Sequence, residues 1–112
     1  MYYKKLAGCY PYFFPRTKVW ELPLCLQDDV LFRDLKLTQN QAFLLVKEFI
    51  EDVKKINGVC VLNFHPILIE RNLNCYKKIL EFLNKQTDIL VIPASELVDL
   101  MNERKLEMDR FY

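Results

Sequence analysis

A nearly continuous apolar run, from Val59 to Phe64, constrains the fold of this chain more than any other feature. Asn57-Gly58 precedes the run and His65-Pro66 follows it, so residues typical of turns bound it on both sides. A short run without alternating polar positions is typical of a strand that is covered on both faces, as in a parallel sheet. We therefore predict a buried strand over residues 59–64.

The residues before this run carry a helical pattern. Apolar side chains recur there at steps of three and four, at Ala42, Val46, Phe49, Val53 and Ile56. Thr38 suits the N-cap of this helix, and Gly58 suits a left-handed C-terminal cap. We predict a helix from about residue 39 to residue 57.

The same kinds of pattern predict the remaining elements. Residues 18–26 and 88–93 indicate strands, although Pro23 weakens the first or places it at a sheet edge. Residues 73–85 and a segment capped by Ser95 indicate helices, whereas the prolines in residues 1–17 indicate a loop. Strands that alternate with helices predict one α/β domain over residues 1–112, with parallel strands.

Charge and hydropathy narrow the partners that such a domain can have. Sixteen Lys and Arg face fifteen Asp and Glu, for a net charge of +1. This balance predicts no nucleic-acid partner, because such proteins carry a basic patch. No apolar run approaches the roughly 20 residues of a membrane span, so none is expected. The first residues do not resemble a secretory signal, so the piece as given is expected in the cytoplasm, its wider localisation being open.

The cysteines do not form a metal-binding pattern. Cys9, Cys25, Cys60 and Cys75 include no Cys-x-x-Cys pair, and the chain has a single His. No structural zinc site is therefore expected, and no metal ligand is assigned. Cys25 and Cys60 lie in apolar runs, where a reduced Cys behaves as a small hydrophobic residue.

Candidate reactive side chains follow the predicted strands. Asp28 and Asp29 come after the first strand, His65 after the second and Ser95-Glu96 after the third. Because parallel α/β folds place their reactive groups at these strand ends, one rim is expected to carry them. His65 is suited to proton transfer. Each residue also has a structural alternative: a cap for Asp28 or Asp29, a helix start for Ser95-Glu96, and a hydrogen-bonded structural role for His65.

Three further segments are informative as a set, in this order: Ala7-Gly-Cys-Tyr-Pro-Tyr12 with Val19-Trp-Glu-Leu-Pro-Leu24, then Asn57-Gly-Val-Cys-Val-Leu-Asn-Phe-His-Pro66, then Ile89-Leu-Val-Ile-Pro-Ala-Ser-Glu-Leu97. Together they resemble the C-terminal part of polysaccharide deacetylases. The resemblance implies the C-terminal half of an incomplete (β/α)7 barrel. It also implies a hydrolase that removes acetyl groups from carbohydrate with a divalent metal such as zinc.

The resemblance also implies roles for four residues. His65 matches the general acid of the family's late Leu-x-His motif, with one additional residue in Leu62-Asn-Phe-His65. Asp28 resembles a late Asp that orients this His or lines the pocket. Tyr10 and Trp20 are candidates for an aromatic wall that binds sugar, with burial in the core as the alternative.

The family's early motifs are absent from these 112 residues: the Asp-Asp segment that follows Thr-Phe, and His-x-x-x-His. These motifs supply the metal ligands and the base, so the chain alone is expected to be inactive. Three hypotheses remain open. The chain is part of a deacetylase whose other half comes from a missing N-terminal region or from an oligomer, a non-catalytic oligomerising or carbohydrate-binding domain, or a small unrelated enzyme that uses His65 and Asp28.

Overall fold

The longest predicted helix is present and lies at the centre of the fold. The structure is a computed structural model that describes residues 9–109, and α1 spans Gln39–Lys55. Thr38 is its N-cap, as predicted, and forms a reciprocal capping box with Gln41. The Gln41 N–H donates to Thr38 Oγ1 at 3.2 Å, and the Thr38 N–H donates to Gln41 Oε1 at 2.9 Å. One face of α1 enters the core through Ala42, Val46, Phe49, Ile50 and Val53.

The end of α1 differs from the prediction. Asn57, with a φ of 54°, takes the left-handed position that was expected for Gly58. Asn tolerates this conformation better than most residues. Gly58 is instead required by a close approach, because a Cβ at this position would lie 2.9 Å from the Cys9 carbonyl oxygen.

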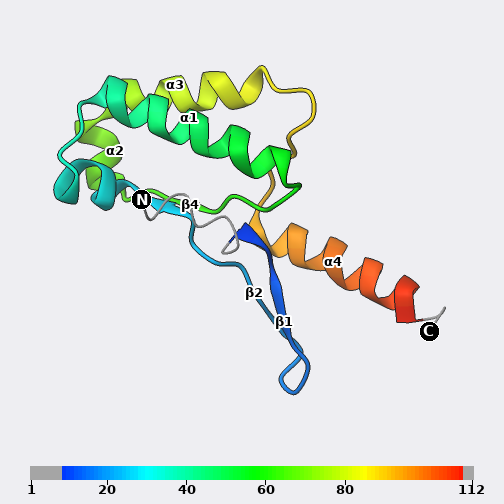
Figure 1. Cartoon of the computed structure of the whole chain (residues 1–112). Coiled ribbons are helices and arrows are strands. Elements are labelled where there is room, and N and C mark those ends of the chain that lie inside the picture. Colours follow the sequence, from blue (N-terminus) through cyan, green and yellow to red (C-terminus); the bar gives the residue numbers. More distant parts are fainter. Residues whose placement is uncertain (1–8, 110–112) are drawn as a thin grey trace.

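Two further helices follow His65 in the chain, and the longer of them packs against α1. The short α2 (Pro66–Arg71), which was not predicted, begins directly after His65 with Pro66 in its first turn. The predicted helix near residue 73 is α3 (Leu73–Asn84), which runs beside α1 (Figure 1) and buries Cys75 and Ile79. The Cys75 N–H donates to Gln39 Oε1 at 2.9 Å and ties the start of α3 to the start of α1.

The two described sheets are small, and each has two strands. β3 (Leu26–Gln27) and β4 (Leu62–Asn63) pair in parallel, with Leu26 opposite Leu62 and Gln27 opposite Asn63. The connection between them contains a π-helix, Val30–Asp34, and then α1. β1 (Tyr12–Phe14) and β2 (Val19–Glu21) form an antiparallel hairpin that extends away from α1 (Figure 1). Residues 9–109 thus form a mixed α/β structure without a closed barrel.

The strand predictions were only partly right. The predicted strand 18–26 is divided between β2 and β3, because Pro23, which has no N–H to donate, lies between them. Residues 12–14, predicted as loop, form β1 because β2 offers them a partner. The predicted strand 59–64 is reduced to the two residues of β4, because only Leu62 and Asn63 pair with β3.

The third predicted strand is absent from the described residues. Residues 88–93 contain no strand, and Leu90 and Val91 are 71% and 66% exposed rather than buried. The last helix, α4 (Ala94–Asp109), begins before Ser95, so Ser95 lies in its first turn and is not its N-cap. No helix in the described part of the chain is both long and apolar enough to cross a membrane.

The packing of α3 on α1 can be tested with two adjacent residues. Ile79 is 2% exposed and belongs to the core, whereas Leu80 is 46% exposed. We expect Ile79→Ala to lower the free energy of unfolding by about 2–5 kcal/mol, because it leaves a cavity between the helices. Leu80→Ala, the control, should change it by less than about 0.5 kcal/mol. Urea denaturation measures both, and equal losses would contradict this orientation of α3.

Candidate active site at the ends of β3 and β4

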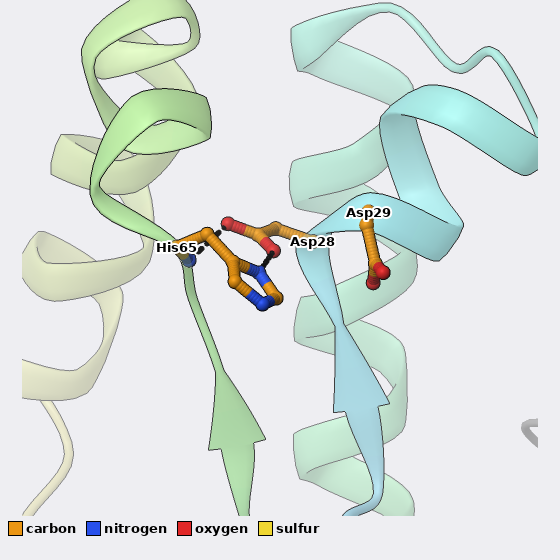
Figure 2. A group of neighbouring side chains, drawn as sticks. All are labelled: Asp28, Asp29 and His65. Atoms are coloured by element: carbon orange, nitrogen blue, oxygen red, sulfur yellow. Dashed lines mark hydrogen bonds and ion pairs between the residues drawn. The ribbon is translucent and has the colours of Figure 1, made fainter.

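The parallel pairing of β3 with β4 brings Asp28 and His65 together. Asp28 directly follows β3, and His65 comes two residues after β4, so both lie at the carboxyl ends of paired strands. Figure 2 shows the Asp28 side chain reaching across from the end of β3 to His65 at the start of α2. This is the edge at which parallel α/β folds place their reactive groups.

Both carboxylate oxygens of Asp28 accept hydrogen bonds from the same residue. Oδ2 lies 2.6 Å from the His65 backbone nitrogen, and Oδ1 lies 2.6 Å from the His65 ring nitrogen Nδ1. Asp28 is only 3% exposed and is the one buried charged residue in the described part of the chain. A buried carboxylate is costly unless its oxygens are paired, so these two bonds explain how the residue is accommodated.

The bonds to Asp28 orient the His65 ring. Because Oδ1 of a carboxylate can only accept, Nδ1 carries the proton and donates it. Nε2 of the neutral ring is then the nitrogen with a free lone pair. The hydrogen bond from Nδ1 to Asp28 fixes one edge of the ring. The His65 side chain is nevertheless 45% exposed, so solvent or a ligand can reach the ring. This geometry suits a side chain that exchanges protons through Nε2.

Asp29 completes a group of three possible metal-ligating side chains. One ligand atom from each of Asp28, Asp29 and His65 lies within 4.8 Å of the others (Figure 2). Asp29 is also the N-cap of the π-helix, where its Oδ1 accepts the Val30 N–H at 2.9 Å. The capping alternative therefore applies to Asp29, whereas Asp28 binds His65.

These side chains do not match the metal site that the family resemblance implies. That site needs one Asp and two His, whereas His65 is the only His in the sequence. Two carboxylates and one imidazole nevertheless form a donor set that divalent transition metals accept. No metal ligand was assigned from the sequence, because no motif contains all three residues and only the fold brings them together.

Mostly apolar side chains surround a small cavity beside Asp28. Asp28 borders a cavity of about 10 Å³, the space of a single water molecule, whose other lining residues come mostly from the π-helix, α2 and α3. Phe64 and Tyr76, which both line this cavity, pack edge to face with ring centroids 5.8 Å apart. The cavity is too small for a sugar, so a substrate can reach His65 only from its exposed outer side.

The structure does not bring the other candidate residues to this pair. Tyr10 is 47% exposed. Its hydroxyl donates to the carbonyl of Ile56, the C-cap of α1, at 2.8 Å. Trp20 lies on β2, where its ring packs against Phe13 and its Nε1–H donates to Asn102 of α4 at 2.7 Å. Neither residue lies in the core, so the alternative of core burial was wrong.

Glu96 does not join the expected rim either. It lies in the first turn of α4 and is exposed. Its predicted position depended on a third strand over residues 88–93, which the described chain does not form. Two of the three predicted strand ends therefore meet, at Asp28 and His65.

Comparison with known proteins identified no relative of this chain. No family model, no curated protein and no solved structure matches the chain. None of these comparisons therefore supports the resemblance to polysaccharide deacetylases, and the site has to be interpreted from its own geometry.

Because Asp28 accepts two hydrogen bonds from His65 and Asp29 accepts one from Val30, substitutions of these two carboxylates should differ in their effect on stability. Asp28→Asn places an amide N–H opposite one of the two His65 donors, so we expect a loss of about 1–3 kcal/mol in the free energy of unfolding. Asp29→Asn retains an oxygen for the Val30 N–H and should lose less. Chemical denaturation measures stability, and ¹⁵N NMR of the His65 ring reports which nitrogen carries the proton. A proton on Nε2 rather than on Nδ1 in the neutral ring of the wild type would contradict the assigned orientation.

Proposed function

We propose that Asp28 and His65 are the proton-transfer pair of a hydrolase site that acts on acetylated carbohydrate, as in the C-terminal part of a polysaccharide deacetylase. The observation that carries this proposal is that both oxygens of a buried carboxylate hold the backbone and the ring of a half-exposed His. A His held in this way is prepared to transfer a proton at Nε2.

In this mechanism, Asp28 is the positioning residue and His65 is the catalytic residue. Asp28 accepts a hydrogen bond from Nδ1–H, which selects the ring tautomer and stabilises the imidazolium when Nε2 is also protonated. Protonated His65 then donates its Nε2 proton to the leaving nitrogen or oxygen of the acetyl linkage. Because Asp28 is buried, its charge acts on the ring with little screening by water.

The other parts of such a site have to come from residues that this chain lacks. Its single His cannot supply the two His ligands of the family's metal, and no residue of the chain matches the family's base. We therefore assign the metal and the base to another segment of a longer protein or to a partner chain of different sequence. Leu90 and Val91, which are strongly exposed where a third strand was expected, support such an additional layer.

The decisive experiment uses the native protein with any segment or partner that accompanies it. We expect His65→Gln to lower kcat for acetate release from an N-acetylated sugar oligomer by about 10²–10⁴-fold, the usual contribution of general acid catalysis. Glu96→Gln, which alters a carboxylate away from the pair, is the control and should retain activity.

Two results would overturn the proposal. Full activity in His65→Gln would show that this ring transfers no proton in the reaction and would favour a non-catalytic domain. Metal-dependent acetate release by the 112-residue chain alone would show that the metal and base do not come from elsewhere.

A second candidate function is binding of a divalent cation by the same group. It is favoured by the 4.8 Å clustering of Asp28, Asp29 and His65. Metal-binding His residues commonly donate their second ring N–H to a carboxylate, which is what Nδ1 does here with Asp28. In this arrangement Nε2 and the Asp29 carboxylate would contact the ion, and Asp28 would orient the ring.

Titration with Zn²⁺ tests this second function. If the group binds zinc, the His65 ring resonances shift in a saturable manner, and Asp29→Asn weakens binding by at least about tenfold. Glu70→Gln, an exposed carboxylate on α2, is the control and should leave the affinity unchanged. If zinc produces no saturable shift, or if Asp29→Asn binds as well as the wild type, the cation site is contradicted.

A further inference from the structure

Three of the four cysteines meet at the opposite end of the β3–β4 sheet. Cys25 directly precedes β3, Cys60 comes two residues before β4, and Cys9 lies on the segment before β1. Backbone hydrogen bonds hold these segments side by side. The Cys25 N–H donates to the Val61 carbonyl at 2.9 Å, and the Val59 N–H donates to the Cys9 carbonyl at 2.6 Å. The cysteines are 16 and 35 residues apart in sequence, so only folding gathers them.

The sulfur atoms of Cys9 and Cys25 are already close. Their Sγ atoms lie 3.3 Å apart, and both thiols are free. A disulfide has a sulfur–sulfur distance of about 2.05 Å, so a side-chain movement of about 1.3 Å would allow the bond to form. Cys9 is buried and Cys25 is half-buried, which makes Cys25 the more accessible of the two sulfurs.

The surroundings distinguish Cys25 from its neighbours. The pKa of Cys25 is lowered to about 6, mainly by a hydrogen bond from Cys60, against the effect of burial and with help from the Val61 N–H and the Cys9 thiol. Burial, followed by the neighbouring Cys25, raises the pKa of Cys9 to about 12. The pKa of Cys60 is also raised, by Cys25 and by burial. Cys25 is therefore the first of the three to ionise, and Cys9 and Cys60 remain proton donors to it.

Two carbonyl groups also contact the Cys25 sulfur. The oxygens of Pro23 and Val59 lie 3.6 Å and 3.5 Å from it and accept a hydrogen bond only from the protonated thiol. The Val61 N–H, 3.4 Å away, favours the thiolate instead. This donor and the two neighbouring thiols lower the pKa of Cys25.

We propose that Cys25 and Cys9 form a redox-active dithiol site that small hydroperoxides oxidise to a disulfide. The Cys25 thiolate attacks the peroxide, its sulfur becomes a sulfenic acid, and the O–O bond breaks with release of an alkoxide, which takes up a proton, or of water from hydrogen peroxide. The Cys9 thiol then attacks the Cys25 sulfur, forming the S–S bond and releasing the hydroxyl group as water with the Cys9 proton. Two electrons from the two thiols reduce one peroxide, and a dithiol reductant restores both thiols.

Peptide mapping of the wild-type chain tests the pairing without any substitution. Treatment of the reduced chain with equimolar hydrogen peroxide should yield a linked Cys9–Cys25 peptide that dithiothreitol separates. The double variant Cys9→Ser, Cys60→Ser, which removes both thiols beside Cys25, should instead stop at a Cys25 sulfenic acid, which dimedone captures. Cys75→Ser, which alters a buried thiol of α3 outside the cluster, is the matched control and should still form the disulfide. A wild-type chain that forms no Cys9–Cys25 link, or links Cys25 to Cys60 instead, would overturn the assignment.

Alkylation gives a second measurement that does not depend on oxidation. The titratable groups that act on Cys25 are Cys9 and Cys60, so the rate of its reaction with iodoacetamide should rise with pH through a midpoint near 6, its thiolate pKa. The midpoint is more informative than the rate, because a thiolate of low pKa is also less nucleophilic. Cys75, whose pKa is raised by burial, should react only at higher pH. A midpoint for Cys25 at or above the ordinary value of about 8.5 would contradict the site.

Discussion

The parallel pairing of Leu26 with Leu62 and of Gln27 with Asn63 determines where the reactive side chains of this chain lie. The carboxyl ends of the two strands carry Asp28 and His65, and their amino ends carry Cys25 and Cys60. Each pair is separated by more than 30 residues in sequence. A shift in this register would separate both pairs, because neighbouring residues on a strand point to opposite faces.

Such a short sheet depends on the helices that cover it. Parallel strands are connected by a crossover, and here α1 supplies it and also contributes the largest share of the buried core. Its capping box and apolar face are local properties, so α1 provides a surface on which β3 and β4 can assemble. α3 then packs beside α1, and the bond from the Cys75 N–H to Gln39 fixes the two helix starts together.

The buried charge of Asp28 links the fold to the proposed chemistry. Its carboxylate joins the end of β3 to the start of α2 by accepting a hydrogen bond from the His65 backbone N–H, and it orients the ring by accepting a second one from Nδ1–H. One residue therefore has a structural role and a positioning role. For this reason the structural alternative for His65 and the proton-transfer proposal are compatible, because the bonds that satisfy His65 in the fold use its backbone N–H and Nδ1 and do not use Nε2.

The sequence alone determined the elements whose signals are local. The position of α1, its Thr38 cap, the start of α3 and the nearness of Asp28 and His65 follow from apolar spacing, capping chemistry and the rule for parallel strand ends. Only the tertiary structure decided which apolar runs became strands, because a strand needs a partner to satisfy its backbone. Residues 12–14 found one, and residues 88–93, although more apolar, did not. It also decided that Cys25 and Cys60 are neighbours of Cys9 rather than isolated small hydrophobic residues, since pairwise contacts across 16 and 35 residues leave no periodic signal in the sequence.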